Sequence, residues 1–276
     1  MISAEGTPPP RGPAPPARAR GGSARSGPAR GGPARDAAAL LLAGEMYGLQ
    51  LDQLAAVLGV SLPRARAVAS SWRSRGYAGL ARLGPGPAWV WLTRPGLAAC
   101  GLPYQAAPPA LGRLAHIRAV TAVRLALEPT AAWQAAGAYW RSERRLRARM
   151  GGRVGLREHL PDGEVHWPDG TPVPWAGECW AVEAELTRKT VRRTAEIMRD
   201  LLGRTADYGS PAAQAREPGR PPRHARVLYV CAPAARPVVS RARSTLGPAA
   251  GRIEIRALPD AGQLPAPGPP PPGPGR

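Results

Sequence analysis

The chain has 276 residues and a mass of 29.0 kDa, which allows one or two domains of ordinary size. Its 38 Lys and Arg residues against 19 Asp and Glu give a formal charge of +19, so a polyanion, above all nucleic acid, is the expected partner. Apolar runs are far shorter than the ~20 residues of a membrane span. The three cysteines form no C-x-x-C pair, which argues against a disulfide scaffold or zinc ribbon and favours the cytoplasm.

Both ends of the chain are rich in Pro and Gly. Residues 1–35 hold eight Pro, seven Gly and six Arg, too few large apolar groups to offset the entropy of ordering, so we expect a disordered basic arm. The arm either is a solvated tail or makes non-specific phosphate contacts. Residues 261–276 are predicted to be a second disordered tail.

Residues 36–100 have the pattern of a winged helix. Asp36 is expected to cap a first helix, and apolar residues at helical spacing predict a second over 51–58. A turn at 59–61 leads to a third helix over about 63–75, and two strands, 80–83 and 89–92, flank the turn at 84–87. The third helix would enter the major groove with four exposed arginines: Arg64, Arg66, Arg73 and Arg75. The alternative is a three-helix packing module with a solvated basic face.

After a Pro-marked linker at 101–110, residues 111–260 alternate between helix-like and strand-like segments, which predicts an α/β domain. The expected helices are 112–128, a helix ending at 202, and 236–246. The expected strands are 139–140, 160–167, 179–187, 226–231 and 252–257.

Two glutamates of the strand over 179–187 alternate with apolar residues, so Glu183 and Glu185 share one face. Buried carboxylates need partners, and a divalent cation such as Mg²⁺ would supply one. Asp162, on the preceding strand, can offer another oxygen ligand. Lys189, the one lysine among 37 arginines, could add positive charge there.

Four basic residues open the helix that follows: Arg188, Lys189, Arg192 and Arg193. Cations oppose the dipole at a helix N-terminus, so a phosphate among them would explain the run. The alternative is a surface salt-bridge cluster with Glu183 and Glu185. His116 is read as a packing residue and His224 as a loop residue. His159, Asp162, Glu164 and His166 could form a metal site, but the favoured interpretation is an exposed strand edge beside a turn.

A Pro-Asp before a strand bearing Glu-x-Glu, within an α-β-β-β-α-β order, resembles the PD-(D/E)XK or restriction-endonuclease-like fold. More narrowly, the chain resembles the actinobacterial replication-relaxation family in its winged helix and in three motifs, W-R-S-E-R-R-L-R at 140–147, L-P-D-G at 160–163 and A-V-E-A-E-L-T-R-K at 181–189. The resemblance covers about 36–260.

This resemblance implies binding of double-stranded DNA near the nucleoid, in the replication or maintenance of plasmids and mobile elements, with replication or mobilisation proteins as further partners. It makes Asp162 and Glu183 the metal ligands and expects a lysine at 185, where this chain has Glu185. Two functions therefore remain open: a DNA-binding protein with a degenerate nuclease domain, and a Mg²⁺-dependent DNA endonuclease with catalytic Asp162, Glu183, Glu185 and Lys189.

Overall fold

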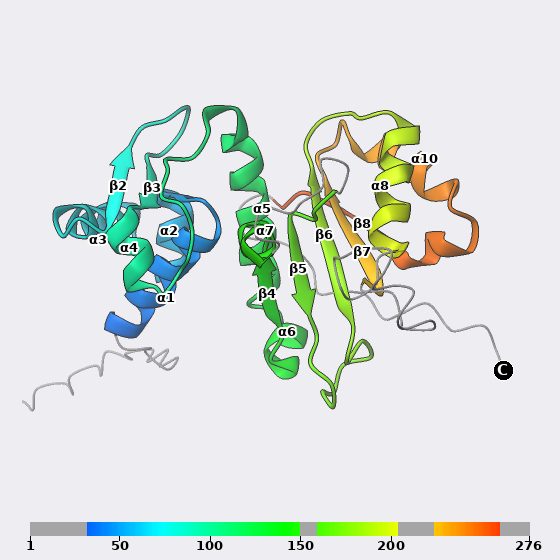
Figure 1. Cartoon of the computed structure of the whole chain (residues 1–276), viewed down its shortest axis with the longest axis horizontal. Helices are drawn as coiled ribbons and strands as arrows, with labels where there is room; N and C mark the ends of the chain where they lie inside the picture. The colour runs from blue at the N-terminus through cyan, green and yellow to red at the C-terminus, as the bar shows by residue number, and fades with distance from the viewer. Residues whose placement is uncertain (1–31, 150–158, 204–223, 260–276) are drawn as a thin grey trace, which may run out of the picture. The chain divides into compact units, whose positions relative to one another are not determined.

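A computed structural model describes residues 32–149, 159–203 and 224–259 (Figure 1). The expected arm up to residue 31 and the expected tail from 261 lie outside the described residues. The described chain mixes helices with two sheets, so the prediction of a mixed α and β fold is confirmed.

The first sheet and its helices come from residues 32–99. The helices are α1 (Gly32–Glu45), α2 (Leu51–Leu58), α3 (Leu62–Ser74) and α4 (Arg94–Ala99). The strands β1 (Leu49–Gln50), β2 (Ala78–Ala81) and β3 (Trp89–Leu92) pair antiparallel in the order β1-β3-β2.

Helix α2 forms where the sequence predicts it. Leu51, Leu54 and Leu58 are buried at helical spacing, and Gly59 ends the helix in the left-handed region at φ 61°. A glycine adopts that backbone without the steric cost of a Cβ. The tight turn lets α3 pack directly against α2.

The starts of two other elements differ from expectation. Helix α1 begins at Gly32, so Asp36 lies inside the helix rather than at its cap, and four residues of the expected arm are helical. Proline is tolerated in a first helical turn, which lets the helix extend upstream through Pro33. Strand β2 spans 78–81 instead of 80–83, because its register pairs Ala78 with Leu92.

The second sheet has five strands in the order β4-β5-β6-β7-β8. They are β4 (Tyr139–Ser142), β5 (Gly163–His166), β6 (Cys179–Glu185), β7 (Arg226–Cys231) and β8 (Ile253–Ala257). Strand β5 runs antiparallel to both β4 and β6, whereas β6, β7 and β8 run parallel to one another.

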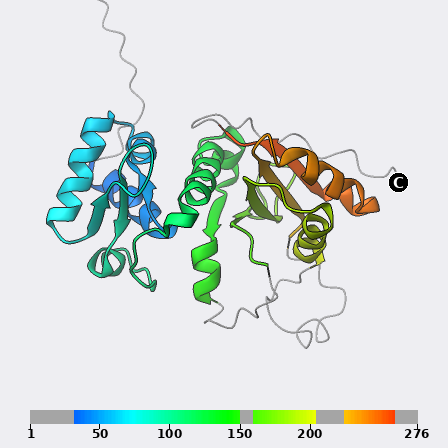
Figure 2. The ribbon, with the colours of Figure 1, turned by 90° about the horizontal axis from the view of Figure 1, so that it is seen from above.

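Helices lie on both faces of this sheet (Figure 2). The α-helices are α5 (Leu114–Leu127), α6 (Ala131–Ala136), α7 (Glu143–Arg149), α8 (Val191–Gly203) and α10 (Arg236–Ser244), with 3₁₀ turns η1 (Leu111–Arg113) and η2 (Gly247–Arg252). Helix α5 packs on the face of Trp180 and Val182, while α8 and α10 cover the face of Ala181 and Tyr229. The predicted alternation along β6 therefore separates two hydrophobic cores.

Polar contacts connect α5 and β4 to the first helices. The Arg118 guanidinium binds both carboxylate oxygens of Asp52 at 2.9 and 2.6 Å, and Gln53 Nε2 donates to the Arg118 carbonyl at 2.9 Å. The buried carboxylate of Glu45 accepts hydrogen bonds from the hydroxyls of Tyr104 and Ser142. Within the expected linker, residues 102–110 have no regular secondary structure.

The prediction of an exposed edge around residues 159–166 is wrong for Glu164. This side chain is fully buried, and so is His224, which the sequence places in a loop without a role. His224 Nε2 lies 3.0 Å from Glu164 Oε1. A buried carboxylate needs compensating partners, and the histidine reaches it from a distant part of the chain.

Candidate functional site

The candidate site lies on the sheet face covered by α8, at the carboxyl end of β6. Glu183 and Glu185 are 4% and 5% exposed, two residues apart on this strand. Their side chains share the face of Ala181, as the alternation predicts. The fold thus buries two acidic groups at one strand end.

Asp162 joins them from the neighbouring strand. It directly precedes β5, whose Gly163 pairs with Val182 of β6. One carboxylate oxygen accepts a hydrogen bond from the backbone N–H of Ala184 at 2.8 Å, and the other lies 2.7 Å from His116 Nε2. We call Asp162, Glu183 and Glu185 the acidic cluster.

His159, on the segment that leads into β5, contacts the acidic cluster. His159 Nε2 lies at hydrogen-bonding distance, 2.9 Å, from Glu183 Oε1. Burial raises the pKa of Glu183 to about 7, the charge of Asp162 adds to the rise, and the hydrogen bond from His159 and the charge of Lys189 oppose it. Near neutral pH, a proton on Glu183 is therefore readily exchanged for another cation.

Lys189 reaches the same place from beyond the end of β6. Its Nζ lies 2.5 Å from Glu185 Oε2, and its side chain is 36% exposed. Because its charge also lowers the pKa of Glu183, the ammonium group acts on both glutamates. The structure therefore brings together all four residues predicted to be catalytic.

A buried tyrosine hydroxyl faces the acidic cluster. Tyr229 is 1% exposed on β7, opposite Glu183 in the parallel register. Its Oη forms no hydrogen bond with the described residues. Burial, followed by the charges of Glu183 and Glu185, raises its pKa well above the usual value, so the hydroxyl keeps its proton.

The donor set of the acidic cluster fits a hard divalent cation. Carboxylate oxygens are the ligands that Mg²⁺ prefers, and within the described part of the chain Glu183 Oε2 and Glu185 Oε1 accept no hydrogen bond. The buried hydroxyl of Tyr229 beside them is a further oxygen donor. Asp162, Glu183 and Glu185 are the residues that would hold the ion.

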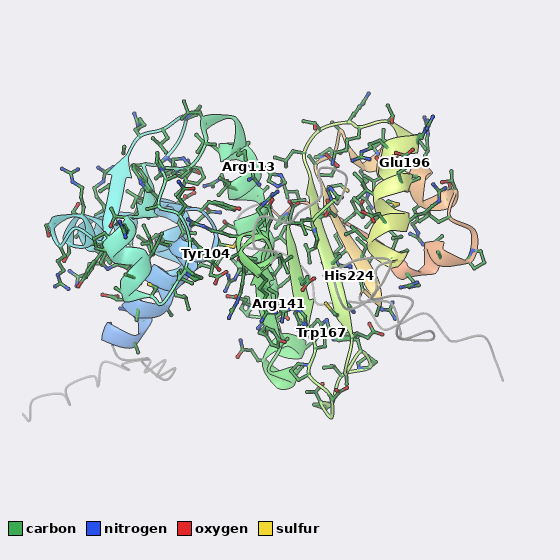
Figure 3. The ribbon with its side chains drawn as sticks, in the orientation of Figure 1. Tyr104, Arg113, Arg141, Trp167, Glu196 and His224 are labelled. Atoms are coloured by element: carbon green, nitrogen blue, oxygen red, sulfur yellow. The ribbon has the colours of Figure 1, made fainter. Side chains whose placement is uncertain are left out.

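The remaining basic residues near the start of α8 turn away from the acidic cluster. Arg192 and Arg193 pair with Glu196 on their own helix, at 2.9 and 3.7 Å. Figure 3 labels Glu196 on α8. Arg188 donates to the Ala234 carbonyl at 2.9 Å. Of the four predicted phosphate ligands, only Lys189 lies beside the acidic cluster, and salt bridges within α8 account for the two helical arginines.

The predicted DNA-binding arginines are exposed on or next to α3. Arg64, Arg66 and Arg73 lie on the helix and Arg75 at its C-cap. None of the four forms an ion pair with a described residue. Arg66 also lines a groove with Arg82 and the loop of residues 84–87.

The favoured sequence interpretation gives no role at this site to three of its residues. His116 lies on an ordinary amphipathic helix, His159 stands outside any strand, and Tyr229 belongs to an apolar strand. The sequence could place Tyr229 on the face of the two glutamates only if the register between β6 and β7 were known. That register is not determined by the local sequence.

Comparisons with known protein families, with curated proteins and with solved structures find no match for this chain. Among the described residues, no helix has the length and apolar character needed to cross a membrane.

Proposed function

We propose that this chain is a DNA-binding protein of the replication-relaxation type, in which residues 36–100 bind the duplex as a winged helix. The observation that carries the proposal is a set of four exposed arginines on or next to α3 that form no ion pair with the described residues, namely Arg64, Arg66, Arg73 and Arg75. Arginines without acidic partners are available to phosphates, in contrast to Arg192 and Arg193.

The order of elements supports this use of α3. Helix α2, a tight turn and α3 are followed by the antiparallel pair β2 and β3, which is the order of a winged helix. Arg82 and the loop of residues 84–87 border the same groove as Arg66. The recognition helix and the wing would then contact one stretch of duplex from adjacent sides.

Salt-dependent binding of the full chain tests the proposal. Fluorescence anisotropy with a labelled duplex measures affinity between low and moderate salt. Arg66→Ala and Arg73→Ala should each weaken binding and reduce the salt slope by about 1. Arg241→Ala, an exposed arginine on α10, is the matched control. Wild-type affinity and slope in the Arg66→Ala/Arg73→Ala double variant would reject the assignment.

A second function, cleavage of DNA, is favoured by the convergence of Asp162 and Glu183 with Lys189. The order α5-β4-β5-β6-α8-β7, apart from the short helices α6 and α7, is the α-β-β-β-α-β order behind the resemblance to PD-(D/E)XK nucleases. When bound, a divalent cation would neutralise charge on a scissile phosphate and acidify a coordinated water. Lys189 would supply positive charge, and His159 would hold a proton at Nε2.

Plasmid nicking in Mg²⁺ or Mn²⁺ distinguishes this function from binding alone. We expect Asp162→Asn and Glu183→Gln to abolish any cleavage while leaving duplex affinity unchanged, because the exposed arginines are untouched. Glu196→Gln, an acidic residue of α8 paired with Arg192, is the control. Cleavage that survives both substitutions, or no cleavage of supercoiled, linear or single-stranded DNA, would leave the sheet domain as a binding scaffold.

A further inference from the structure

A second group of ionisable side chains lies on the same sheet face as the acidic cluster, at the opposite end of β5 and β6. Because these strands are antiparallel, Asp162 and Glu183 lie at one end while His166 pairs with Cys179 at the other. The backbone N–H of Ala225 donates to the Cys179 carbonyl at 2.8 Å, which brings His224 to this end as well.

Three side chains meet there with the spacing of metal ligands, and His166 lies beside two of them. Ligand atoms of Glu164, Cys179 and His224 all lie within 4.8 Å of one another. His166 Nε2 lies 2.9 Å from Glu164 Oε2 and 3.6 Å from Cys179 Sγ. Ligands at about 2.0–2.3 Å from a tetrahedral zinc ion are about 3.3–3.7 Å apart, which lies between the shortest of these separations, 2.9 Å, and the 4.8 Å limit.

The orientation of His224 matches that of a metal ligand. Its Nδ1 lies 3.0 Å from the Leu201 carbonyl, which can only accept, so Nδ1 carries a proton. In the neutral imidazole the lone pair is then on Nε2, which faces Glu164 at 3.0 Å. A backbone carbonyl behind the ring is the usual support for a histidine that binds metal through its other nitrogen.

Charge and access also suit a zinc ion. A thiolate from Cys179 and the carboxylate of Glu164 balance two positive charges, and Arg141 lies 3.3 Å from Glu164 Oε2 as an outer partner. Glu164 and His224 are fully buried, whereas Cys179 and His166 are part-exposed and give the ion a route from solvent. Mixed sulfur, nitrogen and oxygen ligands favour Zn²⁺ over Mg²⁺.

We propose that Glu164, Cys179 and His224, with His166 as fourth ligand, bind a structural zinc ion that fastens β5, β6 and the start of β7 together. All four coordination positions come from protein side chains, so the site is closed and leaves no position for substrate. It is independent of the acidic cluster, which offers carboxylate oxygens to a harder ion.

Metal analysis of the full chain, with zinc and cobalt as probes, tests the proposal. Protein purified from zinc-supplemented medium should carry about one zinc per chain, and chelation should lower its melting temperature. After chelation, Co²⁺ should give a thiolate-to-cobalt charge-transfer band. Cys179→Ser should lose the zinc and the band, while Cys100→Ser, which alters a half-buried thiol elsewhere, should keep both.

A second variant distinguishes zinc bound by Cys179 from metal bound by the acidic cluster. Glu183→Gln should retain the cobalt band, because the acidic cluster contains no thiolate. The proposal is overturned if wild-type protein takes up no zinc and shows no cobalt band, or if Cys179→Ser retains both. If Cys179→Ser fails to fold, the presence or absence of the cobalt band in the wild-type protein still tests the proposal.

Discussion

The ammonium nitrogen of Lys189 lies 2.5 Å from Oε2 of Glu185, the residue at the position where the nuclease pattern has a lysine. The chain turns after β6 so that a side chain four residues further on returns to the strand end. A positive charge therefore reaches the acidic cluster although the strand itself carries a glutamate. The structure supplies the charge from a different residue while leaving an additional carboxylate in the cluster.

Removing this charge should affect metal affinity and cleavage in opposite directions. Lys189→Ala leaves three carboxylates with less compensation, so Mg²⁺ should bind about threefold to fivefold more tightly, the effect of one partly exposed charge. Any cleavage should fall, because a cation near the scissile phosphate is lost. Titration calorimetry and plasmid nicking measure the two effects. Lys189→Arg should behave like the wild type in the titration, and weaker Mg²⁺ binding by Lys189→Ala would contradict the argument.

The metal-free protein should lose stability as the pH rises from about 4.5 to above 7. Burial raises the pKa of Glu183 from 4.5 to about 7. Burial lowers the pKa of His159, but the hydrogen bond to Glu183 and nearby negative charge outweigh it and raise the pKa above 6.5. Both groups hold protons more tightly in the folded state, so unfolding releases protons and becomes easier as the pH rises.

Urea unfolding in EDTA at pH 5 and pH 8 measures this loss. The rise in the pKa of the Glu183 carboxyl corresponds to about 3 kcal/mol of unfolding free energy. Glu183→Gln lacks this titration, so its stability should change much less between the two pH values. Equal or higher wild-type stability at the higher pH would show that the carboxyl is already ionised at low pH.

Arg118→Ala should weaken the link between α2 and α5. Its guanidinium binds Asp52 through two hydrogen bonds and also donates to Gln50. The pair is about one-third exposed, so solvent screening limits the expected loss to about 1 kcal/mol. The midpoint of urea unfolding measures the loss of stability, provided that the slope of the unfolding free energy against urea concentration is unchanged. Arg64→Ala, at an exposed arginine of α3, should change stability by less than about 0.5 kcal/mol.

Local sequence patterns predicted much of the fold. The alternation from Cys179 to Glu185 located β6 and the face of its glutamates, and apolar spacing located α2 to the residue. Both elements can be predicted from the sequence because burial of one face gives their apolar residues a regular spacing. Short helices such as α4 and α6, with six residues each, contain too few turns to show a period and were not predicted.

The partners of buried polar groups could not be predicted in this way. His224 stands among prolines and arginines in the sequence, yet its ring is buried against Glu164, 60 positions earlier in the chain. His159 and Glu183 are likewise 24 positions apart in the chain, yet their side chains lie 2.9 Å from each other. Such contacts depend on strand order and register, which are properties of the whole sheet. For the acidic cluster, the grouping of its three carboxylates was predictable from residues on two adjacent strands, whereas its histidines and Tyr229 were not.

Gly163→Ala should destabilise the fold between the two sites. Gly163 lies between Asp162 and Glu164, and a Cβ at this position would come 2.1 Å from Cζ2 of Trp140 on β4. The tryptophan ring is buried and has little room to move, so overpacking should cost about 1–3 kcal/mol. Thermal and urea unfolding measure the loss. Gly112→Ala is the matched control, because nothing lies within 4 Å of its added Cβ. If both variants were as stable as the wild type, the glycine of the L-P-D-G motif would be required for something other than the close approach of Trp140.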